Sequence, residues 1–205
     1  MTKVYSEEQP VAGKSHVVLT VWKKSLLYNC NGFTVIDSNG NLVYRVDNYA
    51  DQRKSDEIVL MNASGRPLFT VHRKRLSLSD NWLVYEGDNM VKPRFSVKKH
   101  MNPLNTTSLA SVSTVVESSN YNNSNSKNAN YEIERSYTRK CCAMYDDRRR
   151  CVAEIRLKET NGGVALGGDV FQLVVHPAVT DPAIVMAMVI VLDQMFGSSS
   201  RHFCT

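Results

Sequence analysis

The stretch from Asp181 to Gly197 constrains the fold most, because it predicts a helix with no polar face. Between residues 183 and 192 no side chain is polar, whereas a helix on a protein surface keeps one polar side. Asp181 suits the N-cap, Pro182 suits the first helical position, and Gly197 stands where a left-handed residue often ends a helix. The stretch therefore predicts a helix over residues 182–196 that the rest of the chain must surround.

A membrane span is the competing interpretation of this stretch. A bilayer core requires about 20 apolar residues, and the apolar run ends sooner, at Asp193 and Gln194. A buried helix is therefore favoured. The first ten residues lack the apolar core of a secretory signal. We expect a cytoplasmic protein without a transmembrane segment.

Much of the remaining chain has the pattern of short strands joined by tight turns. The clearest hairpin covers residues 33–46, with Asn39 and Gly40 at its tip, where both residues can take positive φ. The same pattern recurs downstream with Gly65 aligned to Gly40. Three segments repeat the order strand, turn, strand: residues 58–71, 82–97 and 142–155.

The hairpins predict a single domain over residues 16–197. Antiparallel hairpins with one apolar face leave exposed edges unless the sheet closes. We therefore predict a mainly β fold, a closed antiparallel barrel of about twelve strands around the hydrophobic C-terminal helix. A polar, Asn/Ser-rich tract near residues 105–130 predicts a disordered loop. Residues 1–15 predict a flexible N-terminus, and residues 198–205 a C-terminal tail.

Five segments of the chain carry a resemblance to a known family: Thr20–Ser25, Gly32–Tyr49, Tyr131–Glu134, Gly168–Val175 and Asp181–Met195. They closely resemble the plant LURP-one-related family, and the resemblance extends from about residue 16 to residue 196. That family is similar to the C-terminal domain of tubby proteins and to phospholipid scramblases. The resemblance therefore implies a closed twelve-stranded barrel threaded by a hydrophobic C-terminal helix.

The chain departs from the family pattern at two places. Arg135 stands where the family's glycine is expected, and Arg148–Arg150 replaces a more usual glycine-containing turn. Scramblase relatives also carry an acidic calcium-binding segment near the helix, whereas residues 177–181 offer one carboxylate. Because calcium requires several oxygen ligands, we expect no calcium site.

The sharpest candidate site is a group of cations. The net charge of +5 is concentrated in short basic groups. Tubby domains bind phosphatidylinositol bisphosphate through a basic strand, and the nearest match here is Val71–Arg75. If Leu76, Leu78 and Trp82 face inward, Arg73 and Arg75 face outward on the same strand, where guanidinium groups could bind phosphates. The alternative is an ordinary charged outer face of a strand. The predicted lipid-binding residues are Arg73, Lys74, Arg75, Lys98 and Lys99.

Other motifs do not indicate chemistry. The glycine-rich segment 162–168 lacks the Lys-Ser/Thr of a phosphate-binding loop. Cys141 and Cys142 are adjacent on a predicted strand, so we expect one core thiol and one surface thiol, with palmitoylation or redox activity as the alternative. The histidines have no metal-binding spacing, and no nucleophile elbow is present. We therefore expect no enzyme activity, no cofactor and no metal site.

The sequence and the family resemblance together predict a non-enzymatic binding module in plant defence-related signalling. The expected partners are anionic phospholipid head groups, phosphoinositides among them, or another protein. Nucleic acid is not expected, and neither is an oligomer. We expect the protein in the cytoplasm, at the plasma membrane or in the nucleus. The alternatives are a nucleus-associated regulator of transcription and a scramblase-like lipid protein.

Overall fold

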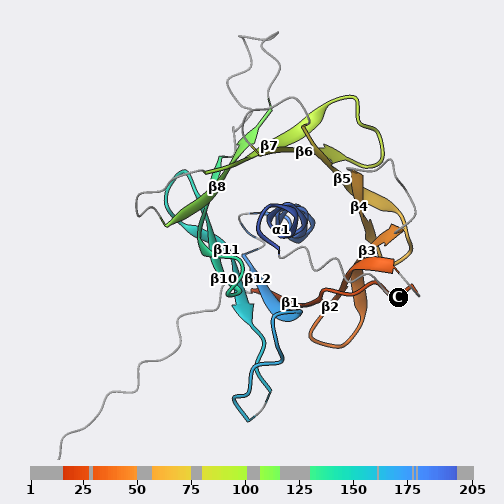
Figure 1. The fold of residues 1–205 in the computed structure, drawn as a ribbon, viewed down its shortest axis with the longest axis vertical. Coiled ribbons are helices and arrows are strands. Elements are labelled where there is room, and N and C mark those ends of the chain that lie inside the picture. The colour runs from red at the N-terminus through yellow and green to blue at the C-terminus, as the bar shows by residue number, and fades with distance from the viewer. Residues whose placement is uncertain are drawn as a thin grey trace, which may run out of the picture.

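The computed structural model describes residues 16–27, 30–49, 57–74, 80–100, 107–115, 130–160, 162–176, 178 and 180–197. The predictions for residues 1–15 and 198–205 lie outside these ranges. The described residues form twelve strands and one helix (Figure 1). Their bounds are β1 Val17–Trp22, β2 Cys30–Ile36, β3 Leu42–Tyr49, β4 Glu57–Asn62, β5 Pro67–Arg73, β6 Asn81–Glu86, β7 Pro93–Lys99, β8 Ser108–Thr114, β9 Tyr131–Ser136, β10 Cys141–Asp146, β11 Cys151–Leu157, β12 Val170–Val175 and α1 Pro182–Phe196.

The strands close into one antiparallel barrel, as predicted. Each strand pairs with its neighbours in the sequence, and β1 pairs with β12 from Val17 opposite Val175 to Trp22 opposite Val170. Because every strand has a partner on both sides, the barrel has no free edge that could pair with another chain. Figure 1 shows α1 running through the middle of the ring of strands.

Helix α1 has the predicted bounds, but its C-terminus differs from the prediction. The Asp181 side chain accepts a hydrogen bond of 2.8 Å from the Ala183 N–H, and Pro182 begins the helix. Gly197 has φ −62°, so it is not left-handed. Glycine is required there for another reason: a Cβ on Gly197 would lie 2.3 Å from the carbonyl oxygen of Asp193.

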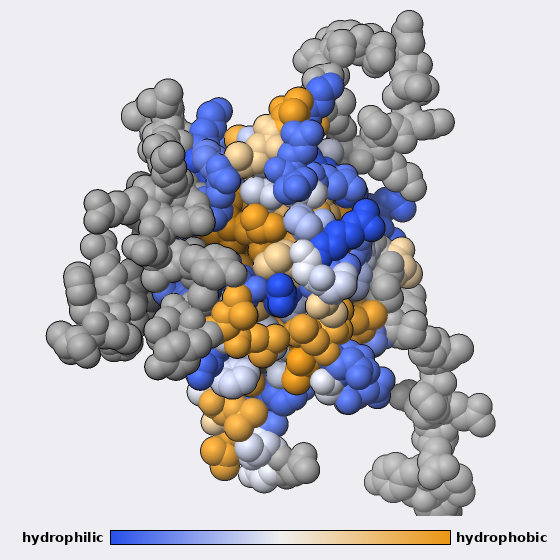
Figure 2. Space-filling view, turned by 90° about the vertical axis from the view of Figure 1, so that its right-hand side faces the viewer, coloured by the Kyte–Doolittle hydropathy of each residue, from blue (hydrophilic) through white to orange (hydrophobic). Residues whose placement is uncertain are grey.

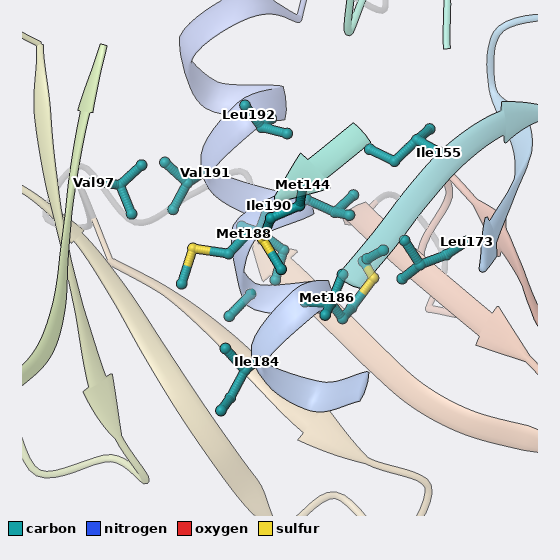
Figure 3. Close-up of a cluster of buried hydrophobic side chains, with 14 of the residues drawn as sticks. Val97, Met144, Ile155, Leu173, Ile184, Met186, Met188, Ile190, Val191 and Leu192 are labelled. Carbon is teal, nitrogen blue, oxygen red and sulfur yellow. The ribbon is translucent and has the colours of Figure 1, made fainter. Parts of the chain in front are cut away.

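The barrel wall and α1 together form one core. Every residue of α1 from Ala183 to Asp193 is buried, and Figure 3 shows Val97 and Leu173 extending from the wall toward the helix. Ile190 and Val97 expose none of their surface. Burying such a side chain contributes about 1.5–3 kcal/mol. The helix thus fills the interior that a closed sheet of this size would otherwise leave empty.

The hairpins that recur in the sequence share a turn conformation in the structure. In the β2–β3 turn the Asp37 carboxylate accepts hydrogen bonds from the N–H groups of Asn39 and Asn41, each 2.8 Å long. Gly40 has φ +85°, as does Gly65 in the aligned β4–β5 turn. Asn39 is not among the described non-glycine residues with positive φ, so only the glycine of the predicted Asn-Gly pair needs that conformation.

The two departures from the family pattern fall on left-handed positions. Arg149 aligns with Gly40 in the third copy of the hairpin and has φ +61°, and Arg135 has φ +76° at the end of β9. L-residues other than glycine pay about 1–2 kcal/mol in this region. The resemblance therefore located two sites at which glycine fits better than arginine.

The predicted loop near residues 105–130 is wrong in part, because β8 occupies Ser108–Thr114. Its serines and threonines made the segment look like the polar tract beside it. Ala110 and Val112 nevertheless alternate inward and expose none of their surface, and small residues fit the crowded barrel interior. Residues 116–129 lie outside the described part of the chain.

The outside of the barrel is chemically mixed. Figure 2 shows the side that lies to the right in Figure 1, where hydrophilic side chains are interspersed with hydrophobic ones. Within the described part of the chain, no helix has the length and apolar character needed to cross a bilayer.

We predict that Ile190→Ala lowers the free energy of unfolding by about 2–5 kcal/mol, because it removes buried methyl groups and leaves a cavity at the barrel axis. Val91→Ala is the control, since Val91 is 74% exposed and its truncation should cost less than about 0.5 kcal/mol. Urea denaturation measures both. Equal effects of the two substitutions would contradict burial of the helix.

We predict that Arg135→Gly raises the free energy of unfolding by about 0.5–1 kcal/mol. The substitution relieves the strain of the left-handed backbone, and the greater entropy of glycine in the unfolded chain offsets part of this gain. Arg135→Ala is the matched control, because it removes the same side chain but keeps the strain. Thermal and urea denaturation should rank glycine above both arginine and alanine. If alanine stabilises as much as glycine, the side chain is responsible and the backbone conformation is not.

Candidate functional site

The barrel end at which α1 terminates is distinct from the other end. The strands run alternately up and down, so the odd-numbered strands all end at one side. Lys23 directly follows β1 and its Nζ lies 3.0 Å from Oδ1 of Asp193, and Lys99 ends β7 and its Nζ lies 2.9 Å from the carbonyl oxygen of Met195. We call this end the C-terminal mouth.

The basic groups of the sequence are unevenly divided between the two ends. Arg148–Arg150 lies in the β10–β11 turn at the opposite end, and Arg53 and Lys54 fall outside the described residues. The other groups follow odd-numbered strands or end them. Those at the C-terminal mouth are Lys23–Lys24, Arg73–Lys74, Lys98–Lys99 and Arg139–Lys140.

Arg73 does not lie where the sequence pattern placed it. It is the last residue of β5 and pairs with Trp82, which belongs to β6 and is buried. The two residues are therefore on neighbouring strands and share the inner face of the barrel, which contradicts the predicted outward position on one strand. At the rim the Arg73 side chain is exposed, and its Nε donates to Oδ1 of Asp80 at 3.1 Å. Arg75 lies outside the described residues.

Lys74 and Lys98 form an outward pair. The Lys74 N–H donates to the carbonyl oxygen of Asn81 at 2.9 Å, and Asn81 pairs with Lys98 on the other side. The two lysines are therefore separated by one strand, about 10 Å between their backbones. Both are exposed, and neither forms an ion pair with a described residue. The structure thus brings together two of the five predicted cations on the outer face.

Lys99, another of the predicted cations, faces inward instead. It pairs with Ala110, which is fully buried. Its ammonium group donates to Met195 and lies 4.5 Å from the centre of the Phe196 ring. Since the last carbonyl groups of a helix carry partial negative charge, Lys99 stabilises the end of α1. The last turn of α1 itself contains no basic residue.

A polar cluster that the sequence did not predict occupies the same end of the helix. Asp193 is the one acidic residue of α1 and is 8% exposed. Its Oδ1 accepts a 3.1 Å hydrogen bond from the Tyr137 hydroxyl and forms the ion pair with Lys23. Lys140 is 6% exposed, and its Nζ lies 3.6 Å from the centre of the Tyr137 ring and 4.5 Å from that of Phe171.

The side chains of Lys23, Tyr137, Lys140 and Asp193 line a cavity of about 130 Å³ that we call the helix-end pocket. Burial raises the pKa of Tyr137, with the Asp193 charge adding to the effect, so the hydroxyl remains protonated. Burial is also the main cause that lowers the pKa of Lys140, to about 8, against the attraction of Asp193. The sequence signal for this site was an acidic residue, Asp193, directly after the apolar run of the helix. The wall of the pocket is formed by Lys23, Tyr137, Thr138, Lys140, Gly168, Asp169, Asp193, Phe196 and Gly197.

Exposed apolar side chains surround one sector of the C-terminal mouth. The β1–β2 and β11–β12 connections emerge side by side, because β1 pairs with β12. A bridge between Glu159 and Ala165 shapes the second connection into a small hairpin. Six apolar side chains of this sector are between 38% and 66% exposed: Trp22, Leu26, Leu27, Leu157, Val164 and Leu166.

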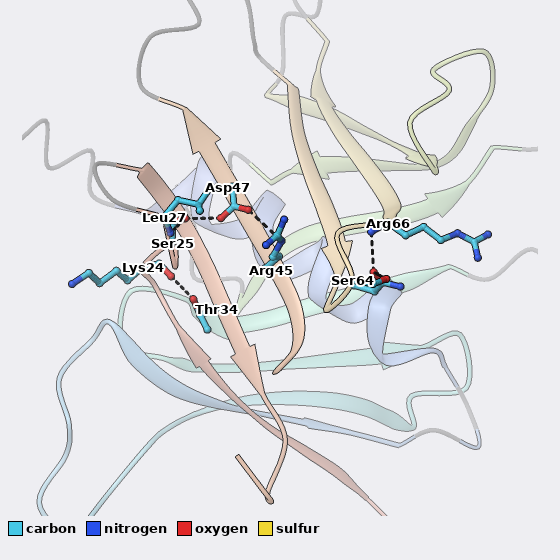
Figure 4. A network of polar contacts seen from close by, with 9 residues as sticks. Lys24, Ser25, Leu27, Thr34, Arg45, Asp47, Ser64 and Arg66 are labelled. Carbon is cyan, nitrogen blue, oxygen red and sulfur yellow. Dashed lines mark hydrogen bonds and ion pairs between the residues drawn. The ribbon is translucent and has the colours of Figure 1, made fainter. Parts of the chain in front are cut away.

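Polar contacts hold the β1–β2 connection in place (Figure 4). The Thr34 hydroxyl donates to the carbonyl oxygen of Lys24 at 2.7 Å, and the Ser25 hydroxyl donates to Asp47 at 2.5 Å. The N–H of Leu27 donates to Ser25. Leu27 and its neighbour Leu26 are thus presented at the surface by a fixed backbone.

The remaining sequence motifs have structural positions. Cys141 is exposed and Cys142 is buried, as predicted, and burial raises the pKa of Cys142 to about 12. The glycine-rich segment leads into β12, a strand, so it does not open a helix as a phosphate-binding loop does. Among the described residues, no three metal-binding side chains gather at one place.

The fold places the chain in the class of antiparallel β-barrels filled by a C-terminal helix. A crystal structure of an Arabidopsis thaliana protein has this fold, with a TM-score of 0.59, 20% sequence identity and coverage of 89% of this chain and 92% of that one. The family model for LURP-one-related proteins matches residues 17–193. The chain belongs to the LURP-one-related family, which confirms the resemblance seen in the sequence.

Two relatives from Arabidopsis thaliana illustrate how much of the chain is shared. Protein LURP-one-related 8 is 47% identical over 209 aligned residues, which cover 97% of this chain and 100% of that relative. Protein LURP-one-related 17 is 43% identical over 199 residues, which cover 90% of this chain and 86% of that relative. Both relatives therefore share nine tenths or more of the length of this chain.

We predict that Lys140 makes stability increase with pH above neutrality. Its pKa is lowered to about 8 in the folded protein, so between pH 8 and 10 the unfolded chain binds more protons than the folded one. The free energy of unfolding of the wild type relative to Lys140→Met should rise by about 2 kcal/mol over this interval. Urea denaturation at several pH values measures the difference. If this difference in the free energy of unfolding stays constant or falls, the pKa of Lys140 is not lowered in the folded protein.

Proposed function

We propose that this chain is a non-enzymatic binding module that docks on anionic membrane surfaces, including those that contain phosphoinositides, through its C-terminal mouth. The observation that carries the proposal is the gathering of cations and exposed apolar side chains at the same barrel end. Peripheral membrane proteins combine these two features. We place the docking step in plant defence-related signalling, as the family resemblance implies.

The cations supply the long-range attraction. Lys74 and Lys98 are exposed and pair with no acid among the described residues, so their charges are available to lipid phosphates. Each lysine near an anionic membrane contributes about 1 kcal/mol. Arg73 already forms an ion pair with Asp80, and Lys99 donates a hydrogen bond to the end of α1. We therefore assign these two residues a smaller part in docking.

The apolar side chains supply the short-range contact. Leu26 is 54% exposed and Val164 is 66% exposed, on adjacent connections at the C-terminal mouth. Trp22 is 44% exposed next to them, and the centre of its ring lies 5.4 Å from the Lys24 Nζ. Tryptophan prefers the interface between head groups and acyl chains. Apolar contact beside basic charge favours a membrane over a soluble anion as the partner.

We predict that Lys74→Ala combined with Lys98→Ala weakens binding to vesicles of phosphatidylcholine with phosphatidylinositol bisphosphate by about 2 kcal/mol, or roughly 30-fold. Co-sedimentation over a range of lipid concentrations measures the binding. Vesicles of phosphatidylcholine alone should pellet little protein, and added salt should weaken binding to the anionic vesicles.

A matched control uses Arg66→Ala combined with Arg148→Ala. These arginines are exposed at the opposite end of the barrel, so the change in net charge is the same. The control should bind as the wild type does. Failure of the wild type to pellet with anionic vesicles, or equal loss in the two double variants, would refute docking through the C-terminal mouth.

A further inference from the structure

The helix-end pocket contains a buried amine that the proposed docking does not use. Lys140 is 6% exposed, and it lines the helix-end pocket. Its neighbours are the faces of Tyr137 and Phe171. The ring faces attract the ammonium group, but burial costs the charged form more than this attraction returns, and the pKa of Lys140 is lowered.

The carboxylate that attracts this amine most strongly, Asp193, already has other partners. Asp193 accepts the hydrogen bond from Tyr137 and forms the ion pair with Lys23. Lys23 therefore places a second cation in the same pocket, and that cation further lowers the pKa of Lys140. Burial in an apolar surrounding and a neighbouring cation are the two conditions that turn a lysine into a nucleophile.

The charged side chains that line the pocket give an anion little net attraction. Asp193 and Asp169 both line it, and the carbonyl groups at the end of α1 add partial negative charge. These charges offset the two lysines, so a phosphate or carboxylate group gains little there. The cavity of about 130 Å³ has room for a small organic molecule or several waters. A small uncharged molecule that reacts with an amine fits these walls.

We propose that Lys140 is a reactive amine that binds small uncharged aldehydes in the helix-end pocket by reversible imine formation. The neutral amine attacks the carbonyl carbon, and a C–N bond forms while the carbonyl electron pair moves to oxygen. That oxygen takes up the proton that nitrogen releases, which gives a carbinolamine. Loss of water then leaves a neutral C=N bond, and no oxidant or reductant is required.

The imine also relieves the environment of Lys140. It replaces a buried charge by an uncharged group, which removes the cost of burying that charge. The Tyr137 hydroxyl and the Lys23 ammonium group line the pocket and are the proton carriers at hand for the dehydration step. Imine-forming lysines in other proteins are likewise made reactive by burial.

The test is reductive trapping on the full chain. The protein is incubated with propanal and sodium cyanoborohydride at pH 7.5, and the modified lysines are identified by peptide mass spectrometry. Lys140 should be propylated at least about tenfold faster than the exposed Lys74 and Lys98, because more of it is uncharged at this pH. Labelling of Lys140 no faster than these two residues would overturn the proposal.

Two further arms separate a reactive site from general labelling. Glyoxylate, an anionic aldehyde, should modify Lys140 at least about tenfold more slowly than propanal does, and equal rates would refute the selection for uncharged ligands. In Lys23→Met the neighbouring cation is lost, so the pH midpoint of Lys140 labelling should move upward, and an unchanged midpoint would refute activation by Lys23. Neither arm depends on membrane docking, so the vesicle experiments can fail while this proposal holds.

Discussion

The burial of an all-apolar helix is the constraint on which the structure depends. Helix α1 has no polar face from Ala183 to Leu192, so it is stable in water only if other elements cover all its sides. Short antiparallel strands need partners on both sides, because a free sheet edge can pair with another chain and cause aggregation. Closing twelve strands around the helix meets both needs at once. With the interior filled, the proposed docking surface lies at a rim of the barrel.

The sequence predicted the fold well because the signals for it are local. Asp181 and Pro182 fix the start of α1, and the turn at Gly40 fixes one hairpin register. Strand β8 was missed because its register is set by neighbouring strands and its own composition is polar. Local periodicity therefore predicts elements reliably only where the composition of a segment reflects its burial.

The candidate site was harder to predict, since it depends on contacts across the barrel. Lys98 and Lys99 are neighbours in the sequence, yet one faces solvent and the other caps α1. Lys23 pairs with Asp193 and Lys140 lines the same pocket, although the two lysines belong to connections that are far apart in the chain. A basic dipeptide at the end of a strand thus contributes one cation to the rim and one to the interior, and only the closed barrel reveals which.

The order of elements has a consequence for synthesis. Helix α1 follows all twelve strands in the chain, so the ribosome synthesises the strands of the barrel before the helix that packs inside it. Until then the inward faces of residues such as Leu19 and Val71 lack their central partner, and the emerging strands are open to misassembly. Productive closure must therefore wait for the last segment of the domain. Chaperones that shield nascent strands would have their greatest effect during this interval.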